Sequence, residues 1–76
     1  MSILSEEQKE EIAKKETYLS QKKALVERRK SLLEDLEFAE NDMEEGLIQE
    51  EREILAQKIK ALANRLREIE EWETLV

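Results

Sequence analysis

The side chains with the clearest chemical potential in this sequence are carboxylates that cluster beside its single glycine. Asp42, Glu44 and Glu45 stand just before Gly46, within residues 34–53, which hold ten acidic residues and one arginine. Hard cations such as Mg²⁺ prefer several oxygen ligands, but this spacing is not that of an EF-hand loop. We therefore predict no metal site of the chain's own. Two interpretations remain, a solvated turn or a surface that binds a cationic partner.

Other groups that commonly support catalysis are missing from the sequence. It has no cysteine and no histidine, which removes thiolate nucleophiles, Cys-ligated zinc and the commonest general base. Lys15, Lys22 and Arg29 recur every seven residues and could follow a nucleic-acid backbone, but the net charge of −7 disfavours polyanions. We interpret them as long side chains that cover a helix seam and pair with glutamates. The sequence predicts no enzyme, no cofactor and no direct contact with nucleic acid.

Helical segments must position these side chains. Charged residues make up 43% of the chain, aromatics 4%, and there is no proline, a composition typical of long helices and coiled coils. Ser5 and Gln8 fit a capping box that starts a helix. Apolar residues then recur at helical spacing in one stripe before Gly46 and another after it. The first stripe is Ile12, Leu19, Val26, Leu33 and Leu36. The second stripe is Ile48, Leu55, Ile59, Leu62, Leu66 and Ile69.

The two stripes are out of phase by one residue, which corresponds to about 100° of helical rotation. A turn between them absorbs this difference. We predict a helix over about residues 5–41, an acidic turn over 42–46 and a second helix over about 47–73. The alternative is one continuous helix, because a lone glycine costs only about 1 kcal/mol in a helix.

The charge pattern favours the turn. Residues 9–30 hold eight basic and four acidic residues, whereas residues 68–76 hold four glutamates and no basic side chain. Antiparallel folding brings these oppositely charged segments together. The pairing sets are Lys15, Lys22 and Lys23 with Glu68, Glu71 and Glu73. Tyr18 and Trp72 are predicted to pack at the open end.

Two helices alone bury little apolar surface, and pairing into a four-helix bundle is a common remedy. We therefore predict an all-α fold, an antiparallel two-helix hairpin (coiled coil) that forms a homodimer through the two stripes. The terminal letters ETLV also resemble a ligand of PDZ domains, with Thr74 and Val76 at the pattern positions. The sequence lacks a long apolar run and a secretory signal, so the predicted compartment is cytoplasmic, without membrane contact.

The sequence also resembles the N-terminal coiled-coil domain of the Gre transcript-cleavage factors. The similar segments are LSEEQKEEI at residues 4–12 and KIKALANRLR at residues 58–67, and DMEEG at 42–46 partly matches the family's D-L-x-E-N tip. The resemblance implies a hairpin that enters the secondary channel of bacterial RNA polymerase, where Asp42 and Glu45 would help to hold a catalytic magnesium. Gly46 replaces the family's asparagine, and the spacing from tip to helix is shorter.

Three functions follow from these observations. The first is a non-catalytic helical protein–protein interaction module that self-associates and could act as a regulator. The second is a Gre-like regulator of the RNA polymerase secondary channel. The third is a small acidic inhibitor, of the kind phages encode, that covers the basic surface of a nuclease or another nucleic-acid-binding protein.

Overall fold

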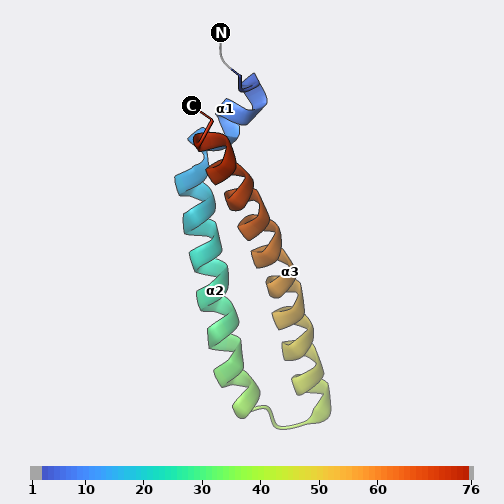
Figure 1. Cartoon of the computed structure of the whole chain (residues 1–76). Coiled ribbons are helices and arrows are strands. Elements are labelled where there is room, and N and C mark those ends of the chain that lie inside the picture. Colours follow the sequence, from blue (N-terminus) through green and yellow to red (C-terminus); the bar gives the residue numbers. More distant parts are fainter. Residues whose placement is uncertain (1–2, 76) are drawn as a thin grey trace.

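The chain folds into three helices that together form a narrow rod (Figure 1). The computed structural model describes residues 3–75, and its helices are α1 (Glu6–Ala13), α2 (Lys15–Glu37) and α3 (Asp42–Glu73). α2 and α3 lie side by side and run in opposite directions, while α1 contacts both of them at the end where α3 finishes. The rod measures 61 × 15 × 15 Å. No strand occurs within residues 3–75, so the predicted all-helical class is confirmed.

The first helix begins as the sequence predicts but ends much earlier. Ser5 is the N-cap of α1, its side chain accepts from the Gln8 N–H at 3.1 Å, and the Gln8 side chain accepts from the Ser5 N–H at 2.9 Å. The expectation of one helix over residues 5–41 is wrong, because the chain bends at Lys14, whose N–H donates to Glu11 and Ile12 carbonyls instead of continuing the α-helical pattern. The bend lets α1 contact α3, and Leu4 is buried.

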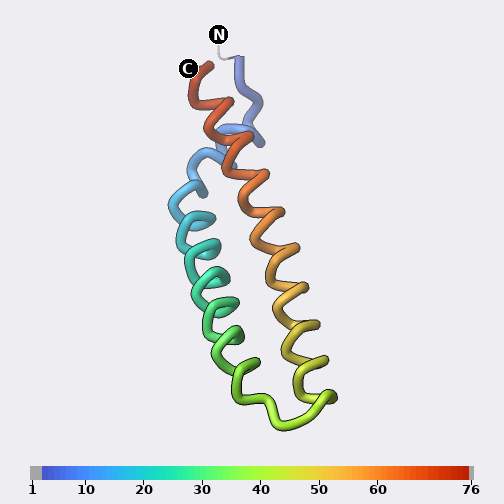
Figure 2. The backbone as a smooth tube through the Cα atoms, turned by 60° about the horizontal axis from the view of Figure 1, so that its bottom comes forward, coloured from blue at the N-terminus to red at the C-terminus, as the bar shows by residue number. Residues whose placement is uncertain are grey.

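The reversal between α2 and α3 falls at residues 38–41, where Figure 2 shows the short connection between the two long helices. The predicted turn at 42–46 and helix start at 47 are therefore displaced. Asn41 is the N-cap of α3, and its side chain accepts from the Glu44 N–H at 2.9 Å. Asn is among the best N-cap residues and acids are favoured in a first helical turn, so α3 begins before the glycine. Gly46 lies inside α3 and has no positive φ.

The seam between α2 and α3 follows a spacing of alternately three and four residues, which is typical of coiled coils. All of the α3 stripe residues predicted from the sequence are buried or half-buried, with Ile69 fully buried. Arg52 occupies a position of the same series. On α2 the corresponding buried or half-buried positions are Tyr18, Lys22, Leu25, Arg29, Leu32 and Leu36.

Two residues of the predicted first stripe, Leu19 and Leu33, therefore lie outside the seam, whereas Ile12, Val26 and Leu36 are half-buried. Leu32 is 2% exposed, whereas Leu33 is 48% exposed and Leu19 is 42% exposed. Two apolar series on α2 lie beside the basic residues Lys22 and Arg29. One series contains Leu25 and Leu32 and the other contains Val26 and Leu33, so helical periodicity alone does not decide which of them enters the seam. In the structure, α2 is rotated so that the stems of Lys22 and Arg29 enter the seam between leucines. Leu19, Val26 and Leu33 are left along one flank of α2.

Candidate interaction surfaces

The acidic residues singled out in the sequence occupy the first turn of α3. Asp42, Glu44 and Glu45 are all exposed. Glu44 takes part in the helix start, because its carboxylate accepts from the Glu40 N–H at 2.8 Å. Within residues 3–75, no group of three acidic side chains is placed to hold a metal ion. Part of the acidic charge is thus explained by the helix start, where it complements the helix dipole.

The same end of the molecule carries exposed apolar side chains. Phe38 is 80% exposed, Met43 is 78% exposed and Leu47 is 62% exposed. Phe38 lies in the connection and Met43 in the first turn of α3, so neither can reach the seam. A signal was available for Phe38, because this aromatic residue near the end of the first predicted helix falls outside both predicted stripes.

The three basic residues that recur every seven positions lie at the edge of the seam, and all are half-buried. The Lys15 ammonium lies 2.8 Å from the Glu73 carboxylate, so the structure contains this predicted cross-helix pair. The hydrogen bond to Glu73 raises the pKa of Lys15 above its ordinary value of 10.5. A second ion pair, Arg28 to Glu51 at 3.1 Å, also bridges α2 and α3.

Two arginines face each other across the seam. The Arg29 Nε donates to the Arg52 backbone carbonyl at 3.3 Å, and the Arg52 Nε donates to the Arg29 carbonyl at 3.4 Å. Both side chains are half-buried. Within residues 3–75, neither guanidinium has a carboxylate partner within ion-pair distance. Each arginine Nε is therefore held at the seam by a backbone carbonyl of the opposite helix.

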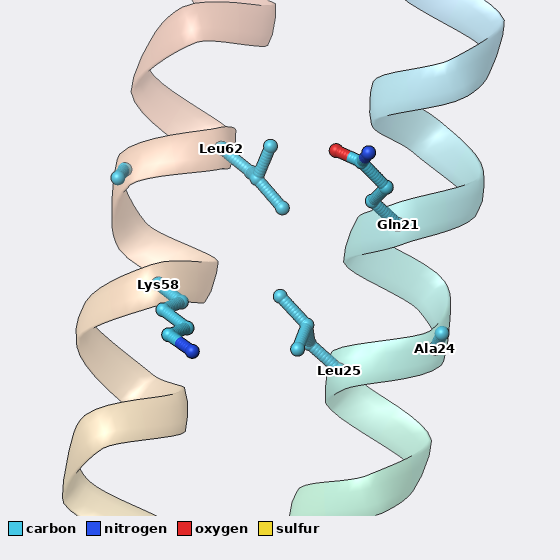
Figure 3. A pocket seen from close by; sticks show the side chains of 6 residues that line it. Gln21, Ala24, Leu25, Lys58 and Leu62 are labelled. Carbon is cyan, nitrogen blue, oxygen red and sulfur yellow. The ribbon is translucent and has the colours of Figure 1, made fainter.

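Grooves run along both sides of the seam. The first groove, here called the Leu62 groove, has a volume of about 490 Å³. Figure 3 shows Leu25 and Leu62 pointing toward each other in it, with Gln21 and Lys58 at its ends. The second groove, here called the arginine groove, has a volume of about 330 Å³. It is lined by Val26, Arg29, Lys30, Leu33, Arg52 and Ile59.

The two grooves lie on opposite sides of the seam because successive residues are rotated by 100° around a helix. On α2, Gln21 and Ala24 precede Leu25 on one side, whereas Val26 and Lys30 lie on the other. The arginine groove therefore shares its side with the exposed stripe of α2, and it carries three cations. The Leu62 groove is lined by one cation, Lys58.

The open end is held together around Glu11 of α1. Its carboxylate accepts from the Tyr18 hydroxyl at 2.5 Å and lies within 4 Å of Lys14 and Arg65. The Tyr18 hydrogen bond lowers the pKa of Glu11 below its ordinary value of 4.5, and both cations act in the same direction, against the opposing effect of burial. The same hydrogen bond raises the pKa of Tyr18. Half-buried Trp72 lines a groove with α1 at this end.

The C-terminal ligand pattern lies partly outside the described residues, since Val76 is not among them. Thr74 has a helical backbone, with φ −73° and ψ −15°, and its hydroxyl donates to the Glu71 carbonyl at 2.6 Å. A PDZ ligand is an extended strand. Docking of this segment in that manner would require the last turn to open.

None of the helices in residues 3–75 has the length and apolar character needed to cross a bilayer. Comparison with protein-family models, curated proteins and solved structures finds no match to this chain. Function is therefore inferred from the surfaces of this chain, which are the seam, the two grooves and the acidic first turn of α3.

Proposed function

We propose that this protein is a non-catalytic helical interaction module, in which α2 and α3 form an antiparallel hairpin that associates with a second copy. The observation that carries the proposal is the pair of exposed leucines on one flank of α2, Leu19 and Leu33, with half-buried Val26 between them. Leu33 also lines the arginine groove, where Ile59 of α3 extends the apolar surface. In a four-helix bundle this side would be covered.

The thin core supports the same proposal. Within residues 3–75, five apolar side chains are buried: Leu4, Leu32, Leu55, Leu66 and Ile69. Small domains whose own core is limited often gain stability by oligomerisation. Covering the exposed leucines would add about 25 cal/mol for each Å² of apolar surface removed from water.

Sedimentation equilibrium over a wide concentration range tests the proposal. Replacing Leu19 and Leu33 with serine should weaken self-association by about tenfold or more, since each side chain would lose on the order of 1 kcal/mol of apolar burial. The matched control replaces Leu47 and Ile54, which are similarly exposed but belong to the other side of the seam. A wild-type protein that remains monomeric throughout, or equal weakening by both pairs, would contradict the proposal.

A second function, regulation of a partner through the acidic end, is supported by Asp42 and Glu45. Both are exposed, and among residues 3–75 no hydrogen bond or ion pair engages their side chains. The resemblance to the Gre family suggests the RNA polymerase channel as that partner, and a nuclease is the alternative. Binding of purified RNA polymerase should fall in the variant Asp42→Asn with Glu45→Gln, and the control Glu50→Gln with Glu53→Gln should bind normally. Equal binding by all three proteins would exclude this role of the tip.

A further inference from the structure

Charge is divided into three zones along the rod. The middle zone combines residues 14–30 with residues 54–67 of α3 and holds eleven basic and two acidic residues. We call it the basic zone. Residues 34–53, here called the connector zone, hold ten acidic residues and one arginine, and the open end is acidic as well. The two halves of the basic zone are distant in sequence and meet because α2 and α3 lie side by side.

The basic zone contains cations that the chain itself does not neutralise. Arg29 is half-buried and donates across the seam to the backbone carbonyl of Arg52, which belongs to the connector zone, and neither arginine has a carboxylate partner among the described residues. Lys30 lines the same groove, and Val26 and Leu33 supply apolar surface beside it. A surface of this kind fits a helical partner that carries both carboxylates and apolar side chains.

We propose that this partner is a second copy of the chain, docked antiparallel, so that the connector zone of each copy covers the basic zone of the other. The proposal rests on the self-association proposed above and adds its side and orientation. Lys14, Lys15, Arg28 and Arg65 of the basic zone are ion-paired within the described chain, which leaves seven basic residues to face the acidic connector zone of the other copy. Complementary charge fixes orientation and register in protein interfaces, and a two-fold dimer uses each zone once on each copy.

A two-fold axis beside Arg29 and Lys30 brings the exposed leucines of the two copies together. Arg29 and Lys30 of both copies then lie near the axis, so the charge match rests on the residues on either side of it. It places Val26 of each copy opposite Leu33 of the other, and Lys23 opposite Glu37 of the second copy. A parallel dimer would set the connector zones against each other, with ten carboxylates on each side. Such like-charge juxtaposition costs several kcal/mol.

The charges that line the two grooves also indicate which side of the seam the second copy covers. The arginine groove is lined by three cations and borders the exposed leucines of α2, whereas the Leu62 groove is lined by Lys58 alone. Charge reversal at Lys58 is therefore a matched control for charge reversal at Lys23. Ile54 is 47% exposed and Leu33 is 48% exposed, so substitution of Ile54 is the matched apolar control for substitution of Leu33.

Single cysteines report the orientation cleanly because the natural chain has none. Lys23→Cys and Glu37→Cys would be treated with a short bis-maleimide, first each alone and then as a mixture. In the antiparallel dimer the two Lys23 positions lie about 20 Å apart along the rod, from about 1.5 Å per residue. Cross-linked dimer is then expected only from the mixture. Efficient cross-linking of each variant with itself, and no product in the mixture that joins Lys23→Cys to Glu37→Cys, would establish a parallel dimer and overturn the proposal.

Charge reversal tests the contact itself. Lys23→Glu and Glu37→Lys should each weaken the dimer about tenfold, the double variant should recover most of the loss, and Lys58→Glu should change little. No recovery in the double variant would overturn this register.

Dimers with the wrong cross-links would refute the orientation alone, whereas a monomer at all concentrations would refute self-association as well. Monomers that bind a single-stranded DNA oligonucleotide through Lys23 and Lys30 would identify the basic zone as a nucleic-acid surface instead.

Discussion

The Lys15 ammonium in the first turn of α2 lies 2.8 Å from the carboxylate of Glu73, the last residue of α3. The two residues are 58 positions apart in the sequence. The pair joins the start of α2 to the end of α3, at the end of the rod opposite the connection between these two helices. Its effect on the pKa of Lys15 leads to a test at alkaline pH.

We expect the protein to lose stability as the pH rises above 10.5. The pKa of Lys15 is raised in the folded protein, so its contribution is present below the ordinary value and is lost as the pH passes the folded-state value. The raised pKa of Tyr18 acts with the same sign. Urea denaturation at about pH 9 and about pH 12 should show a smaller loss in Lys15→Met than in wild type. The control Lys60→Met, at an exposed position of α3, should keep the full loss, and identical losses in all three proteins would contradict the prediction.

The hydrogen bond between Tyr18 and Glu11 predicts the behaviour at acid pH. The pKa of Glu11 is lowered, so its contribution is present above 4.5 and is lost as the pH falls through the folded-state value. Tyr18→Phe removes the largest cause and should raise the pKa of Glu11, measured by NMR titration of its carboxyl carbon. Arg65→Gln should raise it by less. An unchanged pKa in Tyr18→Phe would show that the hydrogen bond is not formed in solution.

Adjacent leucines test the register of the seam. Leu32→Ala should lower the free energy of unfolding by about 2–5 kcal/mol, as is usual for a fully buried leucine. Leu33→Ala should lower it by less than about 1 kcal/mol, because nearly half of that side chain is exposed. Urea denaturation at low protein concentration, where association contributes little, measures both. The reverse order of the two effects would mean that the stripe of Leu19, Val26 and Leu33 forms the core.

Gly46 tests where the chain reverses. It lies in the interior of α3, has no positive φ, and an added Cβ would meet no atom within 4 Å. Gly46→Ala should therefore raise the free energy of unfolding by about 0.5–1 kcal/mol, the difference in helix propensity between the two residues. Thermal denaturation followed by circular dichroism gives the sign directly. Destabilisation would indicate a turn at Gly46 that needs a left-handed conformation.

Much of the fold was accessible from the sequence because it depends on local interactions. The capping box of Ser5 and Gln8 involves residues three apart, and the α3 stripe is set by helical periodicity. The pairing of Lys15 with Glu73 followed from the charge pattern. The glycine was misleading, because the cost of its low helix propensity is small beside the stabilisation from the cap that Asn41 provides five residues earlier.

The sequence by itself determined the helical class, the stripe of α3 and the presence of a reversal near the acidic run. Only the tertiary structure decided which face of α2 enters the seam, since Leu32 and Leu33 are equivalent until α3 packs against one of them. It also decided the bend at Lys14, which no local residue type demands. The basic zone has the same origin, because residues 14–30 and 54–67 become one surface only when the chain reverses, whereas net charge averages over the whole molecule.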